Sequence, residues 1–316
     1  METPADCWES KRNIMKKLAP VLVLTSSILW GSMGIVTRYV ASFGFTTAQT
    51  AAVRICSAAV VLVLLVFFTD KRKFKIQAGD VKWLLGTGIG SLFINNLTYA
   101  EMVQRAPLSV AVVLLYTAPF FVMVLSVLFF REKLTFRKVF ALFLSFAGCI
   151  LVVGLTGAEA RSVGGETVLI GLCAGFGYSL YSIFGKVLVG KYESLTVTVY
   201  TFLIAAAATL LISRPAEMAE KVMGNLSAFP VIFLGSFVTV GLPYLIYSVA
   251  LKHIESSRAS IIASFEVVAA SLFGVVLYGE TLSGMNLAGI LLVVTALTML
   301  QVPAKAKGTD SENLQK

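Results

Sequence analysis

The chain alternates long apolar runs with short polar segments. A bilayer core about 30 Å thick is crossed by roughly 20 helical residues, so each run is long enough for one membrane span. The runs lack the apolar–polar alternation of a barrel wall, and lipid offers the backbone no hydrogen bonds, so we expect helices. The pattern predicts an all-α integral membrane protein with ten transmembrane helices: Leu18–Ala41, Thr47–Phe68, Val81–Ala100, Leu108–Phe130, Phe136–Leu155, Val168–Val189, Leu195–Ile212, Phe229–Leu251, Ala259–Tyr278 and Met285–Leu300.

The connections between the runs are short and leave little room for a separate soluble domain. The first run is too long for the apolar region of a cleavable signal peptide. Met15, which precedes two lysines, is a candidate alternative start. We expect four parts along the chain: an N-terminal tail (1–17), a first repeat of five helices (18–156), a second repeat of five helices (167–301) and a C-terminal tail (302–316).

Composition excludes most classes of soluble protein. Of the 316 residues, 57% are hydrophobic and 14% are charged, against about 25% charged residues in a typical soluble domain. A soluble fold of this size could not keep so many apolar side chains away from water. A soluble enzyme, a secreted disulfide scaffold and a disordered chain are therefore poor interpretations.

The net charge of +9 follows from the placement of Lys and Arg. With a cytoplasmic N-terminus, Arg38 and Arg54 lie within spans, and all but four of the other basic residues fall on the cytoplasmic side. This bias is typical of a multi-pass protein of the cell membrane whose two termini are cytoplasmic. The basic loops would then face an anionic leaflet, so the charge indicates membrane lipid and no nucleic-acid partner. The four exceptions are Arg105, Arg161, Arg214 and Lys221.

Cysteine and histidine usage gives no reason to expect a disulfide, a metal or a cofactor. Cys56, Cys149 and Cys173 lie within predicted spans, no two cysteines have CxxC spacing, and His253 is the only histidine. The glycine run at residues 86–90 resembles a nucleotide-binding loop, but it lies inside a predicted span and no strand precedes it. We interpret it as a surface for close helix packing.

The two halves of the chain are related by an internal repeat. An ungapped shift of 148 residues brings related residues together in three separate regions. Because each half holds five helices, an odd number, the second half must enter the membrane in the opposite orientation. Inverted repeats of this kind are typical of secondary transporters, whose substrate site lies near the midplane between the halves. The matched pairs include Trp30 with Tyr178, Arg38 with Lys186, Tyr99 with Tyr247, Ser109 with Ser257, and Glu132 with Glu280.

Four short segments carry a family resemblance: ILWGS at 28–32, YTAP at 116–119, REKL at 131–134 and GETL at 279–282. With them, the sequence resembles the EamA-type transporters of the drug/metabolite transporter superfamily over about residues 18–300. The resemblance implies a fold of two inverted five-helix repeats whose helices three, four, eight and nine line a central cavity. Where that family often has Glu-Pro, Glu266 precedes Val267, so the kink expected in helix nine is absent or displaced to Pro243.

Glu266 is the first candidate for substrate binding and for ion coupling. It lies about eight residues into the ninth helix, where a charged side chain costs at least ~2.5–3.5 kcal/mol on insertion scales. Its helix face otherwise carries small residues and could border a cavity in which the carboxylate binds a cation or a proton. The alternative is a tightly packed helix seam with Glu266 in a structural ion pair.

Arg54, in the second helix, is the natural partner for that ion pair. Its predicted depth differs little from that of Glu266, and each charge would lower the desolvation penalty of the other. Glu101 is a competing partner for Arg54. If Arg54 pairs with neither carboxylate, its guanidinium could hold a substrate carboxylate through two parallel hydrogen bonds.

Aromatic and amide side chains form a second group of candidates for substrate binding. Polar groups within a span need hydrogen-bond partners, which a hydrated cavity supplies. Aromatic rings beside a carboxylate suit an amine by cation–π attraction and suit an aromatic amino acid by stacking. The alternative is a belt of interfacial Tyr and Trp. The candidates are Trp30, Asn95, Asn96, Tyr99, Tyr116, Tyr178, Tyr244 and Tyr247.

Two prolines mark candidate hinges. Pro119 and Pro243 each remove a backbone hydrogen bond from a helix, and Gly241 adds backbone freedom beside Pro243. A static kink is the competing interpretation.

The leading functional hypothesis is a secondary transporter that exports small polar metabolites such as amino acids or amines by alternating access, with protons as candidate coupling ions. The alternatives are an uncoupled facilitator and an uptake permease for a quaternary amine such as choline. An intramembrane lipid-modifying enzyme is a distant alternative, because it would need a nucleophile and base or a cluster of titratable groups. A structural or receptor-like bundle would not need duplicated halves. The expected state is a monomer or a homodimer.

Overall fold

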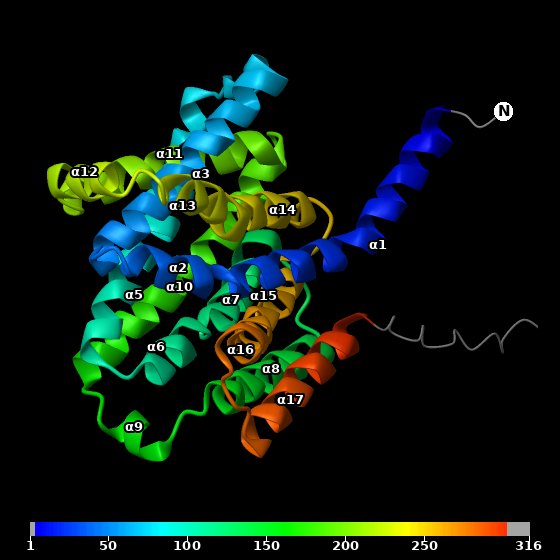
Figure 1. The fold of residues 1–316 in the computed structure, drawn as a ribbon. Helices are drawn as coiled ribbons and strands as arrows, with labels where there is room; N and C mark the ends of the chain where they lie inside the picture. The colour runs from blue at the N-terminus through cyan, green and yellow to red at the C-terminus, as the bar shows by residue number, and fades with distance from the viewer. Residues whose placement is uncertain (1–3, 302–316) are drawn as a thin grey trace, which may run out of the picture.

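The computed structural model describes residues 4–301, and these fold into helices without any strand (Figure 1). The predicted C-terminal tail lies outside the described residues. The first half contains α1 (Pro4–Gly31), α2 (Met33–Ala41), α3 (Thr47–Thr69), α4 (Val81–Leu85), α5 (Ile94–Arg105), α6 (Leu108–Leu115), α7 (Ala118–Phe130) and α8 (Phe136–Val153). The second half contains α10 (Gly165–Val189), α11 (Ser194–Ile212), α12 (Pro215–Gly224), α13 (Phe229–Ser236), α14 (Leu242–Leu251), α15 (Ser256–Ala263), α16 (Phe265–Tyr278) and α17 (Gly284–Gln301).

Shorter elements complete the chain. The loop between the halves contains α9 (Gly157–Arg161), and the loop after α3 contains the 3₁₀ turns η1 (Lys71–Phe74) and η2 (Ala78–Asp80). Two π-helical segments, η3 (Gly86–Phe93) and η4 (Phe237–Gly241), join α4 to α5 and α13 to α14.

Nine helices of the described chain are long and apolar enough to cross a membrane. They coincide with nine of the ten predicted spans, and the main difference is that α1 begins at Pro4, well before Leu18. The third predicted span is helical from Val81 to Arg105 but is not among the nine. It contains two adjacent asparagines, which lower its hydropathy. The fold class is confirmed, and the count of ten stays a prediction.

Several spans are interrupted near their middle. The first breaks at Ser32, the fourth at Tyr116 and Thr117, and the ninth at Ser264. The ninth helix is therefore interrupted by one residue, Ser264, beside Glu266, and the absent or displaced kink stays a prediction. No proline is needed, because the Ser264 hydroxyl donates to the Ile261 carbonyl at 2.6 Å and competes with the helical backbone bonds.

The contacts between helices follow the internal repeat. Helix α1 packs against α14, and its counterpart α10 packs against α5. Likewise α1 contacts α15 and α16, as α10 contacts α6 and α7, while α8 and α17 pack together. The π-helical segments occupy corresponding positions in spans three and eight. The fold is thus built from two repeats with matching internal packing.

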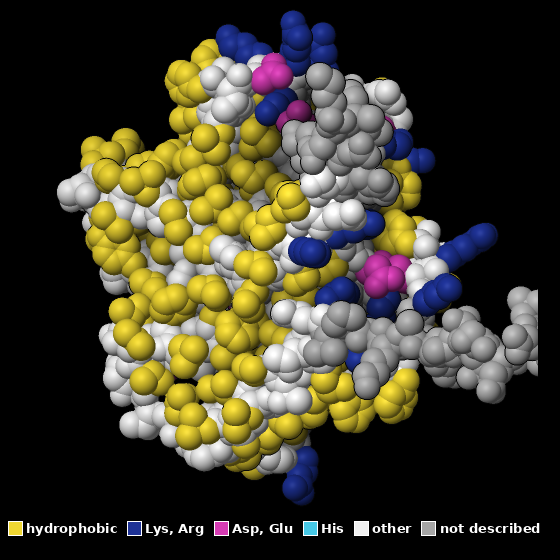
Figure 2. All heavy atoms as spheres, turned by 90° about the vertical axis from the view of Figure 1, so that its right-hand side faces the viewer, with side chains coloured by type: hydrophobic (Ala, Val, Ile, Leu, Met, Phe, Trp, Pro, Cys, Tyr) yellow, Lys and Arg dark blue, Asp and Glu magenta, His cyan; other side chains and the backbone are white. Residues whose placement is uncertain are grey.

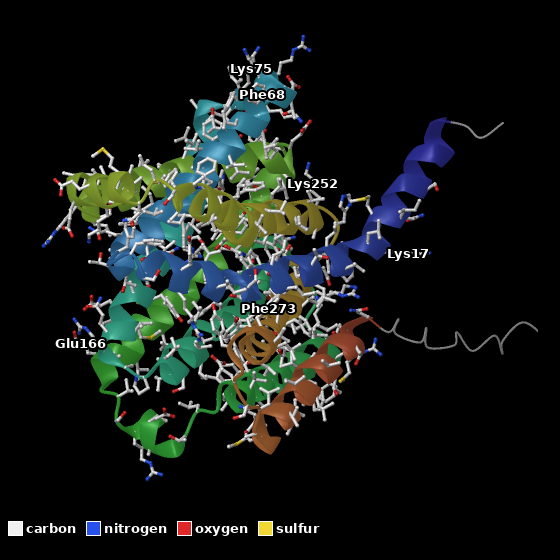
Figure 3. The ribbon with its side chains drawn as sticks, viewed as in Figure 1. Lys17, Phe68, Lys75, Glu166, Lys252 and Phe273 are labelled. Atoms are coloured by element: carbon white, nitrogen blue, oxygen red, sulfur yellow. The ribbon has the colours of Figure 1, made fainter. Side chains whose placement is uncertain are left out.

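The bundle has two ends. We call the end at the start of α1 and the close of α17 the terminal end; both lie toward the right in Figure 1, with α12 at the left. The distal end carries the loops at 42–46, 106–107, 154–164, 213–228 and 279–283. Figure 3 shows Lys17 and Lys252 on the terminal side and Glu166 on the distal side.

The surface is suited to lipid. Large apolar side chains are fully presented to the exterior, among them Leu211 (86% exposed) and Phe136 (84% exposed). Figure 2, which views the terminal end, shows hydrophobic side chains over its left part and Lys and Arg side chains gathered toward its top and right. Such an apolar exterior is stable only within a bilayer, so this is a multi-pass membrane protein.

Candidate functional site

A chamber of about 590 Å³ lies between the two halves. Residues at the distal ends of spans one, four and nine, including Arg38, Ser109 and Glu280, line its outer part. Its inner part is lined by aromatic side chains and by Glu266. The volume is typical of a site for a small organic molecule. Of the predicted binding residues, the chamber is lined by Trp30, Arg54, Asn95, Asn96, Tyr99, Tyr116, Tyr178, Tyr244 and Glu266.

Glu266 is the carboxylate at the inner part of the chamber. The break at Ser264 places it in the first turn of α16, where the helix dipole stabilises a negative charge. The Tyr178 hydroxyl donates to its Oε2 at 3.4 Å, and the Tyr116 phenol approaches the same carboxylate. Two phenols from different halves therefore orient one acidic group toward the cavity.

Helix packing fixes the position of this carboxylate. Gly31 of α1 lies directly against the backbone of α16: an added Cβ would lie 2.8 Å from the Ala270 nitrogen and 2.9 Å from the Glu266 carbonyl oxygen. Only glycine permits this approach, so the first span supports the turn that carries Glu266.

Arg54 pairs with neither of the carboxylates proposed for it from the sequence. Its Nη1 donates to the Thr37 hydroxyl at 2.9 Å, and no carboxylate of the described residues lies within salt-bridge distance. Glu101 instead bonds Arg105 at 2.7 Å, because four residues separate them on one helix face. Both ion-pair interpretations are therefore wrong, and Arg54 lines the chamber without a charged partner.

An aromatic cluster forms the inner end of the chamber. The Trp30 ring centroid lies 5.1 Å from that of Tyr244, 5.4 Å from that of Tyr247 and 6.5 Å from that of Tyr178. Tyr247 does not line the chamber. It is 2% exposed, and its hydroxyl is 2.8 Å from the Ser182 hydroxyl, so it belongs to the packed layer beneath the site.

The paired asparagines use part of their hydrogen-bonding capacity for structure. Asn95 donates to the Ala174 carbonyl at 3.0 Å and so joins the two halves. Asn96 donates to the Leu92 carbonyl of its own helix at 2.7 Å. Since each amide has further donors and an acceptor, both can also contact a ligand in the chamber they line.

The terminal end of the chamber is closed by contacts between the halves. Glu132, at the end of span four, accepts hydrogen bonds from the Ser256 nitrogen at 2.8 Å, the Ser257 nitrogen at 3.3 Å and the Ser257 hydroxyl. The carboxylate thus caps the N-terminus of α15 in span nine. Within the second half, Lys186 donates to the Leu251 and Ile254 carbonyls nearby.

The repeat-related residues at the distal end are arranged differently. Glu280 bonds Arg38 at 3.1 Å, and its side chain is 50% exposed. Ser109 is the repeat counterpart of Ser257. Its hydroxyl is buried without a well-formed hydrogen bond, although the Glu159 carboxylate approaches it. At the distal end, Glu280 therefore does not cap the N-terminus of α6, whereas at the terminal end Glu132 caps that of α15.

Two residues in and beneath the site were not predicted. Tyr181 packs edge-on against Tyr244, with ring centroids 4.7 Å apart. It is 2% exposed and belongs, like Tyr247, to the packed layer beneath the chamber. It lies three residues after Tyr178 on the same helix face, a spacing that could have identified it. Phe273 of α16 lines the chamber and lies near the middle of Figure 3. Nothing in its sequence context distinguishes it from lipid-facing phenylalanines.

The chamber's donor set does not favour a metal. No group of three or more His, Cys, Asp and Glu side chains within residues 4–301 is arranged to hold an ion.

The glycine run at residues 86–90 packs closely against neighbouring helices. Gly86 faces Phe184 and Gly88 faces Ile204, and the Thr87 and Thr201 hydroxyls lie 2.7 Å apart.

Comparison with known proteins identifies the family. The EamA-like transporter family matches this chain twice, over residues 17–154 and 166–301. The chain belongs to the EamA-like transporter family. The two matched segments are the two halves whose helices pack in corresponding ways, so the family and the internal repeat describe the same architecture.

Individual relatives agree with this assignment. The uncharacterized transporter YyaM of Bacillus subtilis (strain 168) is 23% identical over 295 residues, which cover 90% of this chain and 94% of that protein. An uncharacterized transporter of Archaeoglobus fulgidus is 27% identical over 284 residues, covering 87% of this chain and 97% of the relative. A solved crystal structure with 17% identity has a TM-score of 0.73 and covers 89% of this chain and 95% of its own, which shows the shared fold.

Proposed function

We propose that this membrane transporter exports small polar metabolites by alternating access, with Glu266 as the binding and coupling carboxylate. The observation that carries the proposal is the chamber between the halves, with one acidic side chain at its inner part and aromatic rings around it. Such a site attracts a cationic amine through the carboxylate and the ring faces. Amino acids and amines both carry the cationic group that such a site attracts.

The direction of opening supports an outward-facing state. The chamber is lined by distal residues, and the positive-inside rule favours a distal end outside the cell and a basic terminal end in the cytoplasm. The terminal contacts of Glu132 and Lys186 then act as the closed inner gate.

The repeat suggests the opposite state. Exchange of the two halves' conformations would release Glu132 from α15 and let Glu280 leave Arg38 to cap the N-terminus of α6 at Ser109. Arg38, the counterpart of Lys186, would then reach the carbonyls that follow span three. Inverted repeats produce alternating access through such an exchange. Pro119 follows the break in span four, and Gly241 and Pro243 lie where the π-helical segment of span eight passes into α14; these three residues are the proposed hinges.

Proteoliposomes test the proposal. The purified chain is reconstituted, and the fluxes of a radiolabelled panel of amino acids and amines are measured with and without a pH gradient. We expect saturable flux of at least one compound, accelerated by the gradient, and loss of the gradient effect in Glu266→Gln. Glu166→Gln, an exposed carboxylate at the distal surface, is the matched control. Flux in Glu266→Gln that keeps its gradient dependence would remove Glu266 from coupling, and binding without flux would remove transport.

A further inference from the structure

Arg54 is a buried cation that the proposed coupling mechanism does not use. It lies in the first half of α3, two turns after the helix begins at Thr47, is 8% exposed and lines the chamber. Apart from the bond from Nη1 to Thr37, no hydrogen bond from its guanidinium is present among the described residues, and Nε is buried without a partner.

The two carboxylates that line the chamber, and the one proposed from the sequence as a partner, are already engaged elsewhere. Glu266 is bonded by Tyr178, Glu101 bonds Arg105, and Glu280 bonds Arg38 at the mouth of the chamber. Arg54 therefore has no carboxylate partner among the described residues, and the titratable group that interacts with its charge is the Tyr244 phenol.

A buried arginine without a carboxylate partner is energetically unfavourable unless an anion binds to it. Arginine keeps its proton in proteins and presents donors in a planar fork. A buried charge without a partner costs several kcal/mol, and an arginine within a membrane span almost always pairs or faces a hydrated cavity. A carboxylate matches the fork with two parallel charge-assisted bonds.

We propose that Arg54 is an anion-binding subsite of the chamber and that the transported compound carries a carboxylate. Resting on the proposed function, this narrows the substrate class to dipolar compounds, because the carboxylate end would bind Arg54 while a cationic end faces Glu266. Amines and quaternary ammonium compounds without an anionic group would leave Arg54 unpaired and would bind more weakly.

The test uses matched pairs of compounds that differ by one carboxylate. The full chain in detergent is titrated with phenylalanine against phenethylamine, leucine against isoamylamine, and glycine betaine against tetramethylammonium. Binding is followed by the thermal shift and by Trp fluorescence, since Trp30 lines the chamber. A compound that binds the folded form raises the melting temperature. We expect a carboxylate to bind more tightly than its partner in at least one pair.

Three variants locate the effect. Arg54→Gln should weaken the binding of that carboxylate compound by about 30-fold or more, as expected for the loss of one partner of a buried charge pair. It should also abolish the preference for the carboxylate over its amine partner. Arg54→Lys keeps the charge and should retain part of the preference. Arg105→Gln, on the distal surface, should bind as the wild type does.

Several results would overturn the subsite. They are equal or tighter binding of the carboxylate-free partners, unchanged binding in Arg54→Gln, or the absence of an Arg54-dependent response to every carboxylate. Flux measurements separate this outcome from failure of the proposed function. Transport of amines that does not depend on Arg54 would refute the subsite alone, whereas Arg54-dependent binding without flux would refute transport alone.

Discussion

At the scale of single residues, the chamber separates two opposite charges. Glu266 is held by phenols, and Arg54 is held by one threonine hydroxyl. The sequence located both groups within spans, since an ionisable residue in an apolar run is conspicuous. It could not decide their pairing, because helical depth says nothing about the rotation of one helix relative to another. The structure resolves this by turning Arg54 toward Thr37.

A charged contact joins the two halves in the loops beyond the membrane-spanning segments. Lys191 bonds Asp80 at 2.7 Å and Tyr192 bonds it at 2.8 Å, and these hydrogen bonds, led by that of Lys191, lower the pKa of Asp80. A lowered pKa in the folded state adds stability that is present above the unfolded value of about 3.9 and is lost as the pH falls through the folded value.

Asp80→Asn should therefore melt at a lower temperature than the wild type at pH 7, and the two melting temperatures should converge below about pH 4. Thermal unfolding in detergent across this pH range measures the difference. Asp70→Asn in the same loop removes the same charge but keeps an acceptor for the Arg72 nitrogen, so it should change little. A gap between Asp80→Asn and wild type that is independent of pH would contradict this reading.

At the scale of elements, close contact between helices decides the shape of the site. The apolar runs predicted nearly all helix ends, because length and hydropathy are local properties. The break at Ser264 was missed, since it depends on one hydroxyl that bonds its own helix. The packing of Gly31 against α16 was also hidden, because a glycine in a span can face a neighbouring helix or lipid.

Gly31→Ala should lower the melting temperature and weaken ligand binding together. The added Cβ would meet backbone atoms of α16 that cannot move aside singly, so α1 and α16 would separate at Glu266. Gly34→Ala is the control for the melting temperature, because nothing lies within 4 Å of its Cβ position. Thermal unfolding of both variants in detergent measures the effect. Equal melting temperatures for the two variants would show that the close approach is unimportant.

At the scale of the whole molecule, the two related halves form different contacts at the two ends of the chamber. The sequence predicted the repeat, and the family match over both halves and the corresponding helix contacts agree with it. The different contacts at the two ends could not be predicted from the sequence. Glu132 and Glu280 are equivalent in the repeat, yet one caps a buried helix and the other bonds an exposed arginine. Only the conformation that the protein adopts separates them.

Opposite movement of the two ends is the most direct test of this account. In a cysteine-free background, spin labels are placed at Gln104 and Thr281 across the distal mouth, and at their repeat counterparts Lys252 and Lys133 across the terminal end. All four side chains are exposed. Pulsed electron spin resonance then measures both distances in lipid nanodiscs for the wild type, for Glu132→Gln and for the control Glu193→Gln.

Glu132→Gln weakens the cap on α15, so we expect the terminal distance to lengthen and the distal distance to shorten in the same sample. Glu193→Gln, an exposed carboxylate on the same side, should leave both distances unchanged. If Glu132→Gln leaves both distances unchanged, or if both lengthen together, the two ends do not open alternately and the central claim is wrong.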